Sequence, residues 1–174
     1  MVTTEPSASH VAPGTTRIVP YDHARHAGGP WNVIATVFRE YGFEFQVDGY
    51  DRDVQEPHVY FAPGAFAVAE DAEGRVVGCT GFADLGGGVF ELKRLYVLAE
   101  ARRGGIGQWL VEWVLRETRA RGARRVVLYS DTNFVDAHRL YRRMGFRNNR
   151  FRYADDPWRS PEWGFVLDFP EEAR

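Results

Sequence analysis

Hydrophobic residues recur at helical spacing in three segments of the chain, which predicts three amphipathic helices. The first runs through "GPWNVIATVFREYGF", where Gly42 is placed to end it. The second runs through "IGQWLVEWVLRETRARG", and Gly122 stands where a C-terminal cap glycine is common. The third, "NFVDAHRLYRRMGF", is expected to end at Gly145. Each apolar stripe needs a surface to pack against.

The segments between these helices carry strand patterns. "TRIVPY" is expected to be the first strand, and "AFAVAED" with "RVVGCTGFADL" predicts a hairpin whose turn lies near Glu73 and Gly74. After a glycine turn, "VFELKRLYVL" predicts a strand that uses both faces. "RRVVLYS" and "EWGFVLDF" predict two later strands. Residues 47–64 are polar and are interpreted as a loop with a short helical turn.

This order of elements is an antiparallel meander followed by a strand–helix–strand crossover. It predicts an α/β fold of mixed α+β character, with a mixed central sheet of about six to seven strands flanked by helices on both faces. The length of 174 residues fits one domain. We expect residues 15–174 to form it and the polar residues 1–14 to be a flexible N-terminal tail.

Composition narrows the class of function. The formal net charge of −2 gives no reason to expect a nucleic-acid or membrane partner, and no secretory signal or membrane span is apparent. The single cysteine, Cys79, cannot form an intrachain disulfide, which favours a cytoplasmic location and a core role for this residue. No His, Cys or Asp cluster has the spacing of a metal site. Basic residues concentrate after Arg102, which suggests one face for an anionic ligand.

The segment "ARRGGIGQWL" joins a predicted strand to a predicted helix. A glycine-rich turn that opens a helix can direct backbone N–H groups at an anion. A Walker-type phosphate loop would need a lysine after its last glycine, and none follows here. A dinucleotide fingerprint would need glycine at Leu110 and a surrounding βαβ unit. A plain tight turn with solvated arginines is the simplest alternative.

Another interpretation fits better. Arg102-x-x-Gly105-x-Gly107 matches the Q/R-x-x-G-x-G/A pyrophosphate loop of the GNAT superfamily of N-acetyltransferases. "ELKRLYVLAEARRGGIGQWLVEWVL" resembles the fourth strand, loop and third helix of that family, and "AHRLYRRMGF" resembles its late helix. The resemblance covers more than half of the chain. It implies a GNAT fold, acetyl-CoA (coenzyme A) as cofactor, and direct transfer of an acetyl group to a primary amine.

The resemblance also implies which residues bind the cofactor. The backbone N–H groups of residues 103–108 would hold the pyrophosphate, and the strand end "LYV" would hold the pantetheine arm and thioester oxygen. Asn133 is placed either to bind the pantetheine or to cap the helix that follows; we favour the cap, because Phe134 occupies the position that the family gives to asparagine. The expected cofactor-binding residues are Leu95, Tyr96, Val97, Arg102, Arg103, Gly104, Gly105, Ile106, Gly107, Gln108, Asn133 and Ala137.

Two residues are candidates for proton transfer. Tyr141 matches the tyrosine of the family's late helix, which lies near the sulfur, so it is the candidate acid that protonates the departing thiolate; a tyrosine that only packs in the core is the alternative. Glu91 is the candidate base. An alternative role for Glu91 is an ion pair with Lys93 or Arg94. An alternative route for the reaction is deprotonation of the amine through ordered water.

The acetyl acceptor is expected between the first helix and the last strands. Phe38 and Tyr41 are the candidate substrate residues, and Asp156, Trp158 and Glu162 come from the later stretch. Aromatic and acidic side chains together suit a cationic amine. A small amine, an amino acid, an antibiotic and a peptide amine all remain open, as does a homodimer. A non-catalytic acyl-CoA sensor or scaffold and an NAD(P)-binding oxidoreductase are the competing functions.

Overall fold

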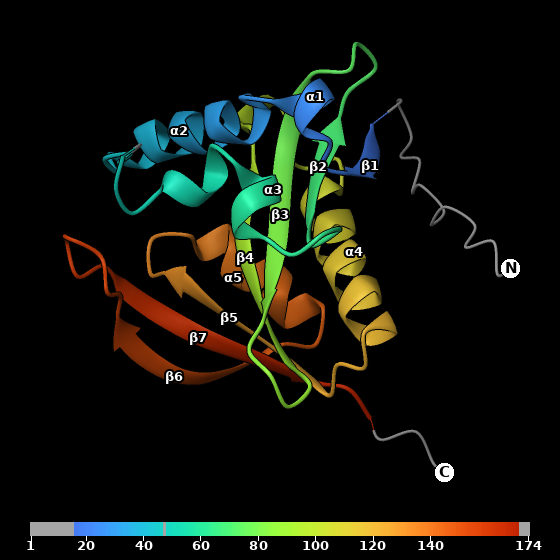
Figure 1. Cartoon of the computed structure of the whole chain (residues 1–174). Coiled ribbons are helices and arrows are strands. Elements are labelled where there is room, and N and C mark those ends of the chain that lie inside the picture. Colours follow the sequence, from blue (N-terminus) through green and yellow to red (C-terminus); the bar gives the residue numbers. More distant parts are fainter. Residues whose placement is uncertain (1–15, 47, 171–174) are drawn as a thin grey trace, which may run out of the picture.

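The computed structural model describes residues 16–46 and 48–170, so the expected tail at residues 1–14 lies outside the described part. One mixed sheet of seven strands has the order β1-β2-β3-β4-β5-β7-β6 (Figure 1). Only the β4–β5 pair is parallel among these strands. The predicted mixed sheet with flanking helices is therefore confirmed.

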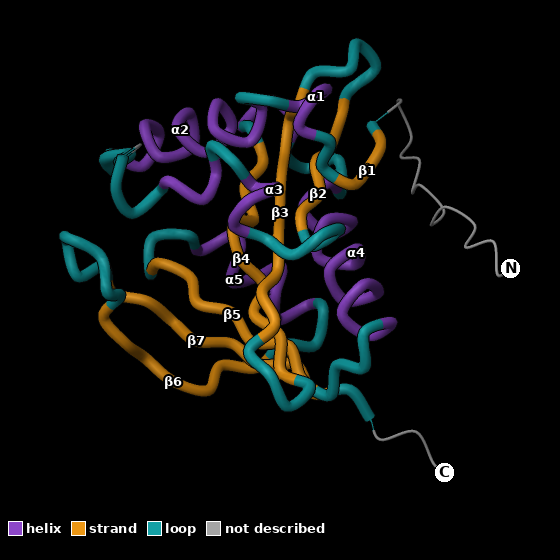
Figure 2. Tube along the Cα trace, in the orientation of Figure 1, coloured by secondary structure: helices purple, strands orange, loops and turns teal. Residues whose placement is uncertain are grey.

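The elements follow the chain in this order (Figure 2). The strands are β1 (Arg17–Pro20), β2 (Phe66–Glu70), β3 (Val76–Asp84), β4 (Val89–Val97), β5 (Arg125–Asp131), β6 (Arg147–Tyr153) and β7 (Pro161–Asp168). The helices are α1 (His23–His26), α2 (Gly29–Tyr41), α3 (Pro57–Tyr60), α4 (Ile106–Ala120) and α5 (Val135–Arg143), with short 3-10 turns η1 (Arg52–Val54) and η2 (Ala99–Ala101). In the described part of the chain, no helix is both long and apolar enough to span a membrane.

The three predicted helices end at the predicted glycines. Gly42, Gly122 and Gly145 follow α2, α4 and α5, with φ angles of 72°, 82° and 93° that L side chains rarely adopt. Two elements, α1 and β6, have no pattern of apolar and polar residues that would predict them. Helix α1 spans a single turn, and every residue of β6 is exposed, so no alternation of apolar and polar residues marks that edge strand.

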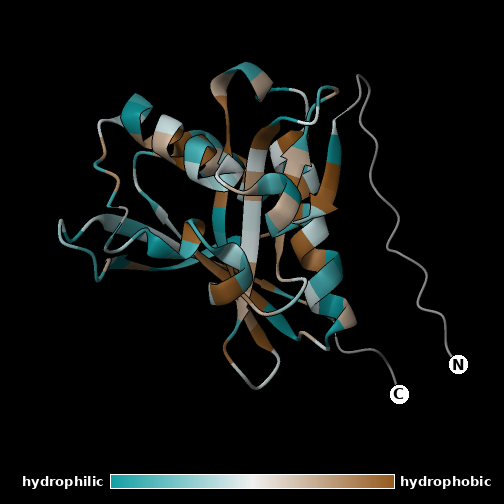
Figure 3. Ribbon diagram, turned by 45° about the horizontal axis from the view of Figure 1, so that its top comes forward, coloured by the Kyte–Doolittle hydropathy of each residue, from teal (hydrophilic) through white to brown (hydrophobic). Residues whose placement is uncertain are grey.

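Helices cover both faces of the sheet. On one face, Trp113 of α4 meets Phe82 of β3 and His138 of α5 meets Phe165 of β7, with ring centroids 5.7 and 5.3 Å apart. On the other face, Phe38 of α2 meets Tyr96 of β4 at 5.6 Å. In Figure 3, hydrophobic residues gather where the central strands and α4 face each other. Two apolar layers therefore hold the sheet between the helices.

The sheet divides between β4 and β5. Their parallel pairing joins residues 89–92 to residues 125–128 and goes no further. Beyond that point β4 stays with β3 to Val97, whereas β5 stays with β7 to Asp131. Figures 1 and 2 show β5, β7 and β6 fanning away from the upper half of β4. The two halves of the sheet leave a gap at the carboxyl ends of β4 and β5.

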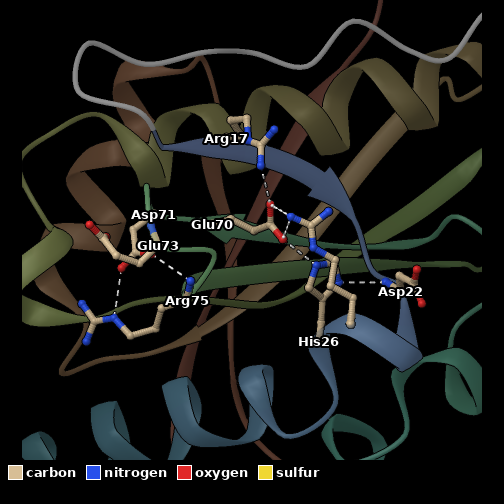
Figure 4. Close-up of polar contacts among 8 residues, drawn as sticks. Arg17, Asp22, His26, Glu70, Asp71, Glu73 and Arg75 are labelled. Carbon is tan, nitrogen blue, oxygen red and sulfur yellow. Dashed lines mark hydrogen bonds and ion pairs between the residues drawn. The ribbon is translucent and has the colours of Figure 1, made fainter.

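A buried carboxylate joins β1, β2 and α1 (Figure 4). The backbone N–H of Asp22 donates to Nδ1 of His26 at 2.9 Å, so the imidazole proton lies on Nε2 and is donated to Glu70 at 2.8 Å. Arg17 and Arg25 reach the same carboxylate from the surface at 3.3 and 2.9 Å. Glu70 and His26 are almost completely buried, so each satisfies a polar group that water cannot reach.

Replacing Glu70 with alanine is expected to lower the free energy of unfolding. The change leaves the buried Nε2–H of His26 without its acceptor, which costs about 1–3 kcal/mol. Arg17→Ala is the matched control, because the half-exposed Arg17 side chain contributes about 0–1 kcal/mol through an ion pair of this kind. Urea unfolding followed by circular dichroism measures both variants. Equal stability of Glu70→Ala and the parent chain would contradict the role given to this carboxylate.

Candidate functional site

A cleft of about 1830 Å³ opens where β4 and β5 separate. It is lined by the end of β4, the loop before α4, one side of α5 and parts of residues 41–61 and 156–162. The structure brings the predicted site residues together here, with the exception of Gly104, which lines a smaller adjacent hollow. The residues that line the cleft as expected are Phe38, Tyr41, Glu91, Leu95, Tyr96, Val97, Arg102, Arg103, Gly105, Ile106, Gly107, Gln108, Asn133, Ala137 and Tyr141.

The loop before α4 presents a row of free backbone donors. Gly105 is the N-cap of α4 with φ 85°, and Arg103 is also left-handed with φ 67°. The first bond of the helix runs from the Trp109 N–H to the Gly105 carbonyl at 3.0 Å. Among the described residues, the N–H groups of residues 103–108 have no acceptor. Such donors at the positive end of a helix dipole form a binding site for an anion such as a pyrophosphate.

The two arginines of the loop differ. Arg102 donates through Nε to the Val97 carbonyl at 2.9 Å and through Nη2 to Glu40 of α2 at 2.7 Å. Its guanidinium therefore fastens the loop to β4 and α2. Arg103 is exposed beside it and forms no ion pair within the described part of the chain. Of the two side chains, Arg103 is the one left available for an anionic ligand.

The division of the sheet has a local cause. Between its pairings with Cys79 and Gly81 of β3, strand β4 carries an extra residue, and Arg94 at this bulge has φ 57°. The Arg94 guanidinium is largely buried and bonds to Asp53 through two nitrogens, at 2.9 and 2.5 Å, and to Asp51 at 2.8 Å. Burial alone would lower the pKa of Arg94, but the two carboxylates outweigh it and raise this pKa. The bulge is thus locked to the loop that covers the sheet.

Tyr141 points from α5 toward the cleft. Its ring packs against Phe146 and Phe165, at centroid distances of 5.9 and 5.4 Å. The Tyr141 hydroxyl has no hydrogen-bond partner among the described residues. Every fully buried polar side-chain atom in that part of the chain has such a partner, so the hydroxyl oxygen is not fully buried. It is accessible from the cleft that Tyr141 lines. Burial raises the pKa of Tyr141. The hydroxyl therefore stays protonated at neutral pH and can donate a hydrogen bond or a proton.

Glu91 lies on β4 at the opposite wall of the cleft. Its carboxylate is mostly buried, with 17% of the side chain exposed, and it lies 3.8 Å from Nζ of Lys93. This separation is an ion pair without a hydrogen bond. The geometry is compatible both with the predicted base and with the ion pair considered as its alternative. Cys79 is fully buried, and burial raises the pKa of its thiol, so this residue belongs to the core as expected.

Asn133 does not cap α5, which corrects the role that the sequence favoured. The helix begins one residue later, with Phe134 at the N-cap position and no side-chain cap bond. The Asn133 amide instead donates to Oδ1 of Asp131 at 2.9 Å, and its backbone N–H donates to the same oxygen. The carboxylate of Asp131 therefore holds the turn that a cap would have held. Asn133 lines the cleft in this position.

Aromatic rings from three elements meet at the side of the cleft where the sequence predicts the acetyl acceptor. Phe134 lies 4.7 Å from Tyr41 and 6.0 Å from Tyr96, measured between ring centroids, and Tyr96 lies 5.6 Å from Phe38. Of the two residues expected at the substrate site, Tyr41 contacts the start of α5 directly, and Phe38 is linked to it through Tyr96. Sequence reasoning missed Phe134 and the Arg94–Asp53 pair as parts of the site. The charged Arg94 in an otherwise mostly apolar strand end was the available signal.

Comparisons with known proteins agree with this geometry. The family model "Acetyltransferase (GNAT) family" matches residues 31–146. An uncharacterized N-acetyltransferase of Schizosaccharomyces pombe is 29% identical over 70% of this chain and 76% of its own length. The uncharacterized N-acetyltransferase YjgM of Escherichia coli is 32% identical over 67% of this chain and 73% of its own length.

Solved structures share the fold. The Salmonella typhimurium protein yncA, solved with its cofactor acetyl-CoA, superposes with a TM-score of 0.69 at 18% identity and covers 92% of this chain and 97% of its own. At this identity the likeness concerns the fold alone, whereas the family model matches about two thirds of the sequence. The chain belongs to the GNAT family of acetyltransferases.

Proposed function

We propose that this chain transfers an acetyl group from acetyl-CoA to a primary amine by direct transfer. The observation that carries the proposal is one continuous cleft that connects the free N–H groups of residues 103–108 to Tyr141 and Glu91. Acetyl-CoA is the cofactor of this chain, as it is of the GNAT family. The donor end of the cleft fits it, because a row of unpartnered N–H groups suits its pyrophosphate.

The chemistry requires a neutral amine and a protonated leaving group. Transfer forms an N–C bond and breaks the C–S bond of the thioester, and the acetyl-CoA supplies the activated acetyl group. Glu91, directly or through water, accepts the proton that the attacking amine loses. Tyr141 supplies a proton to the sulfur, which its raised pKa allows because the hydroxyl is not ionised at neutral pH. The backbone at the end of β4 lies at the same cleft and is available to the thioester oxygen.

The acceptor is a small-molecule or peptide amine. Its side of the cleft is lined by Phe38 and Tyr41 and by groups from residues 156–162. One relative, the aminoalkylphosphonate N-acetyltransferase of Salmonella typhimurium, is 36% identical over 37% of this chain and 42% of its own length. The name of that relative supports an amine acceptor in this family.

An amine panel with acetyl-CoA tests the proposal. Release of free thiol, with formation of an N-acetyl product identified by mass spectrometry, is the expected result. Binding of acetyl-CoA without thiol release over a broad panel of amines would instead favour a non-catalytic acyl-CoA sensor. A rise in melting temperature with NADP and none with CoA would contradict the proposal altogether, because a ligand that binds only the native state stabilises it.

Gly107→Val is expected to raise the KM for acetyl-CoA. Gly107 has an ordinary φ, and an added Cβ would meet only Leu140 Cδ2, at 3.3 Å, so the fold can accommodate the change with a small shift. The larger side chain would obstruct the approach of the pyrophosphate to the loop backbone. Steady-state kinetics measure the effect, and the melting temperature reports on the fold. Unchanged affinity for acetyl-CoA would place the phosphates elsewhere.

The equivalent change at Gly105 is not a clean test. Its φ of 85° disfavours any L side chain, and a Cβ there would lie 3.2 Å from the Trp109 ring. A Gly105 variant would therefore combine backbone strain with loss of the ligand.

Tyr141→Phe is expected to lower kcat by about 10²–10⁴-fold, the range of a positioned general acid. The ring and its packing against Phe146 and Phe165 are kept, so the melting temperature and acetyl-CoA affinity should change little. Thiol release across a range of pH measures the rate.

Tyr96→Phe is the matched comparison, because Tyr96 also lines the cleft and burial likewise raises its pKa. We expect near-parental turnover from Tyr96→Phe. A large loss in the Tyr96 variant with none in the Tyr141 variant would move the role of acid to Tyr96.

A further inference from the structure

The strand register places a set of polar side chains on one face of the sheet. Glu91 of β4 is paired with Val127 of β5, and Val127 and Tyr129 share a face because they are two residues apart. Asp131 is paired with Glu162 of β7, which is paired in turn with Arg152 of β6. Partners in register point to the same side, so these side chains all lie on the face opposite α4 and α5. This is the acceptor side of the cleft.

Arg152 is held in a fixed position on that face. Its guanidinium carbon lies 3.3 Å from the centroid of the Tyr129 ring, and Nε donates to Glu162 at 2.7 Å. The Tyr129 ring has room because it borders Gly164, where an added Cβ would lie 3.2 Å from the ring. Arg152, Tyr129 and Glu162 all line the cleft. We call these three residues the Arg152 stack.

The carboxylates around the stack are already occupied. Asp131 accepts from Asn133, and Asp156 accepts the N–H groups of Trp158 and Ser160. Glu162 is bonded to Arg152, and both oxygens of Asp53 face Arg94. The Glu91 carboxylate is different, because its distance of 3.8 Å from Nζ of Lys93 is too long for a hydrogen bond.

The guanidinium of Arg152 is also different. Within residues 16–46 and 48–170 only its Nε is hydrogen-bonded, which leaves the two terminal nitrogens of this cleft-lining residue without a partner. On this face of the sheet, the described residues therefore offer a carboxylate at Glu91 and a forked cation at Arg152 to a ligand. Arg152 lies three strands away from Glu91, but its guanidinium is stacked on the Tyr129 ring. The Cα atoms of Glu91 and Tyr129 are one strand and two residues apart, or about 8 Å from ordinary strand spacing and rise. The Glu91 carboxylate and the stacked guanidinium can therefore bind two ends of one small molecule.

We propose that Arg152 binds an oxyanion of the acetyl acceptor, so that the acceptor is a small amine that also carries a carboxylate or a phosphonate, such as an amino acid. This inference rests on the proposed function and names its class of acceptor. The forked guanidinium matches a carboxylate or phosphonate through two parallel bonds, and stacking on Tyr129 fixes its plane. The amine end then lies toward Glu91. Arg152 acts as a specificity residue and takes no part in proton transfer.

Matched acceptors test the proposal. Glycine, leucine, phenylalanine and lysine are each compared with the corresponding amide, and aminomethylphosphonate is compared with glycine to separate the two oxyanions. The parent chain should acetylate the acid or the phosphonate at a higher kcat/KM than the amide. Arg152→Gln should raise the KM for the oxyanion-bearing acceptor by about 10- to 100-fold, which is the contribution of a charge-assisted hydrogen bond. The kcat, the KM for acetyl-CoA and the rates with amides should stay close to the parent values.

Two further variants sharpen the result. Arg150→Gln is the matched control. Arg150 lies on the same strand and face as Arg152, and its guanidinium carbon is 5.9 Å from the Tyr129 ring centroid, but Arg150 does not line the cleft. It should leave every KM unchanged. Arg152→Lys keeps the charge without the fork and should restore only part of the affinity. A variant of Arg152 that slows acids and amides equally would point to a structural role and overturn the proposal.

The remaining outcomes separate this inference from the function on which it rests. Equal use of acids and amides by the parent chain overturns the inference. So does acetylation of simple amines with no acetylation of any acid or phosphonate, although the N-acetyltransferase activity would then stand. If no amine releases thiol and acetyl-CoA does not raise the melting temperature, the proposed function itself fails, and the inference fails with it.

Discussion

The separation of β4 from β5 is the constraint on which the site depends. Regular pairing would continue beyond Leu92 and would close the space between the strands, but the bulge at Arg94 turns β4 away. A left-handed conformation at a non-glycine residue is unfavourable by itself. The buried bonds from Arg94 to Asp53 and Asp51 hold it, and they also fix the loop above the sheet. One side chain therefore stabilises the bulge between β3 and β4 and also fastens the loop above the sheet.

The two ends of the cleft use different kinds of groups. At the donor end, backbone N–H groups at the start of α4 present a partial positive charge that depends on chain direction and on Gly105, and very little on side-chain identity. At the end that we propose for the acceptor, side chains from β4, β5, β6 and β7 set the charge and shape. The first arrangement suits a ligand part that is the same in every turnover. The second suits a ligand part whose identity the protein must select.

Much of this arrangement follows from local sequence signals. Helices α2, α4 and α5 and the glycines that end them could be predicted because each helix has one apolar stripe and each glycine supplies a positive φ. The residues of the loop and of α5 were found because each segment resembles a short motif of the GNAT family. The cleft itself confirms that they are neighbours.

Other features depend on contacts that spacing does not encode. Strand β6 is exposed along its whole length, so burial imposes no pattern on it. Asn133 is a residue type that often caps helices, but here the carboxylate of Asp131 accepts its backbone N–H and stabilises the turn instead. Arg94 and Asp53 are 41 residues apart in the chain, and only the folded loop brings them together. The position of Arg152 over Tyr129 likewise follows from the register across three strands.

The location of Arg152 on an edge strand has consequences for how such a protein can diverge. Strand β6 lies at the edge of the sheet and contributes little to the core, so its residues can change at small cost in stability. A chain built in this way can acquire new acceptors by mutation at its margin while the machinery for the shared donor stays intact.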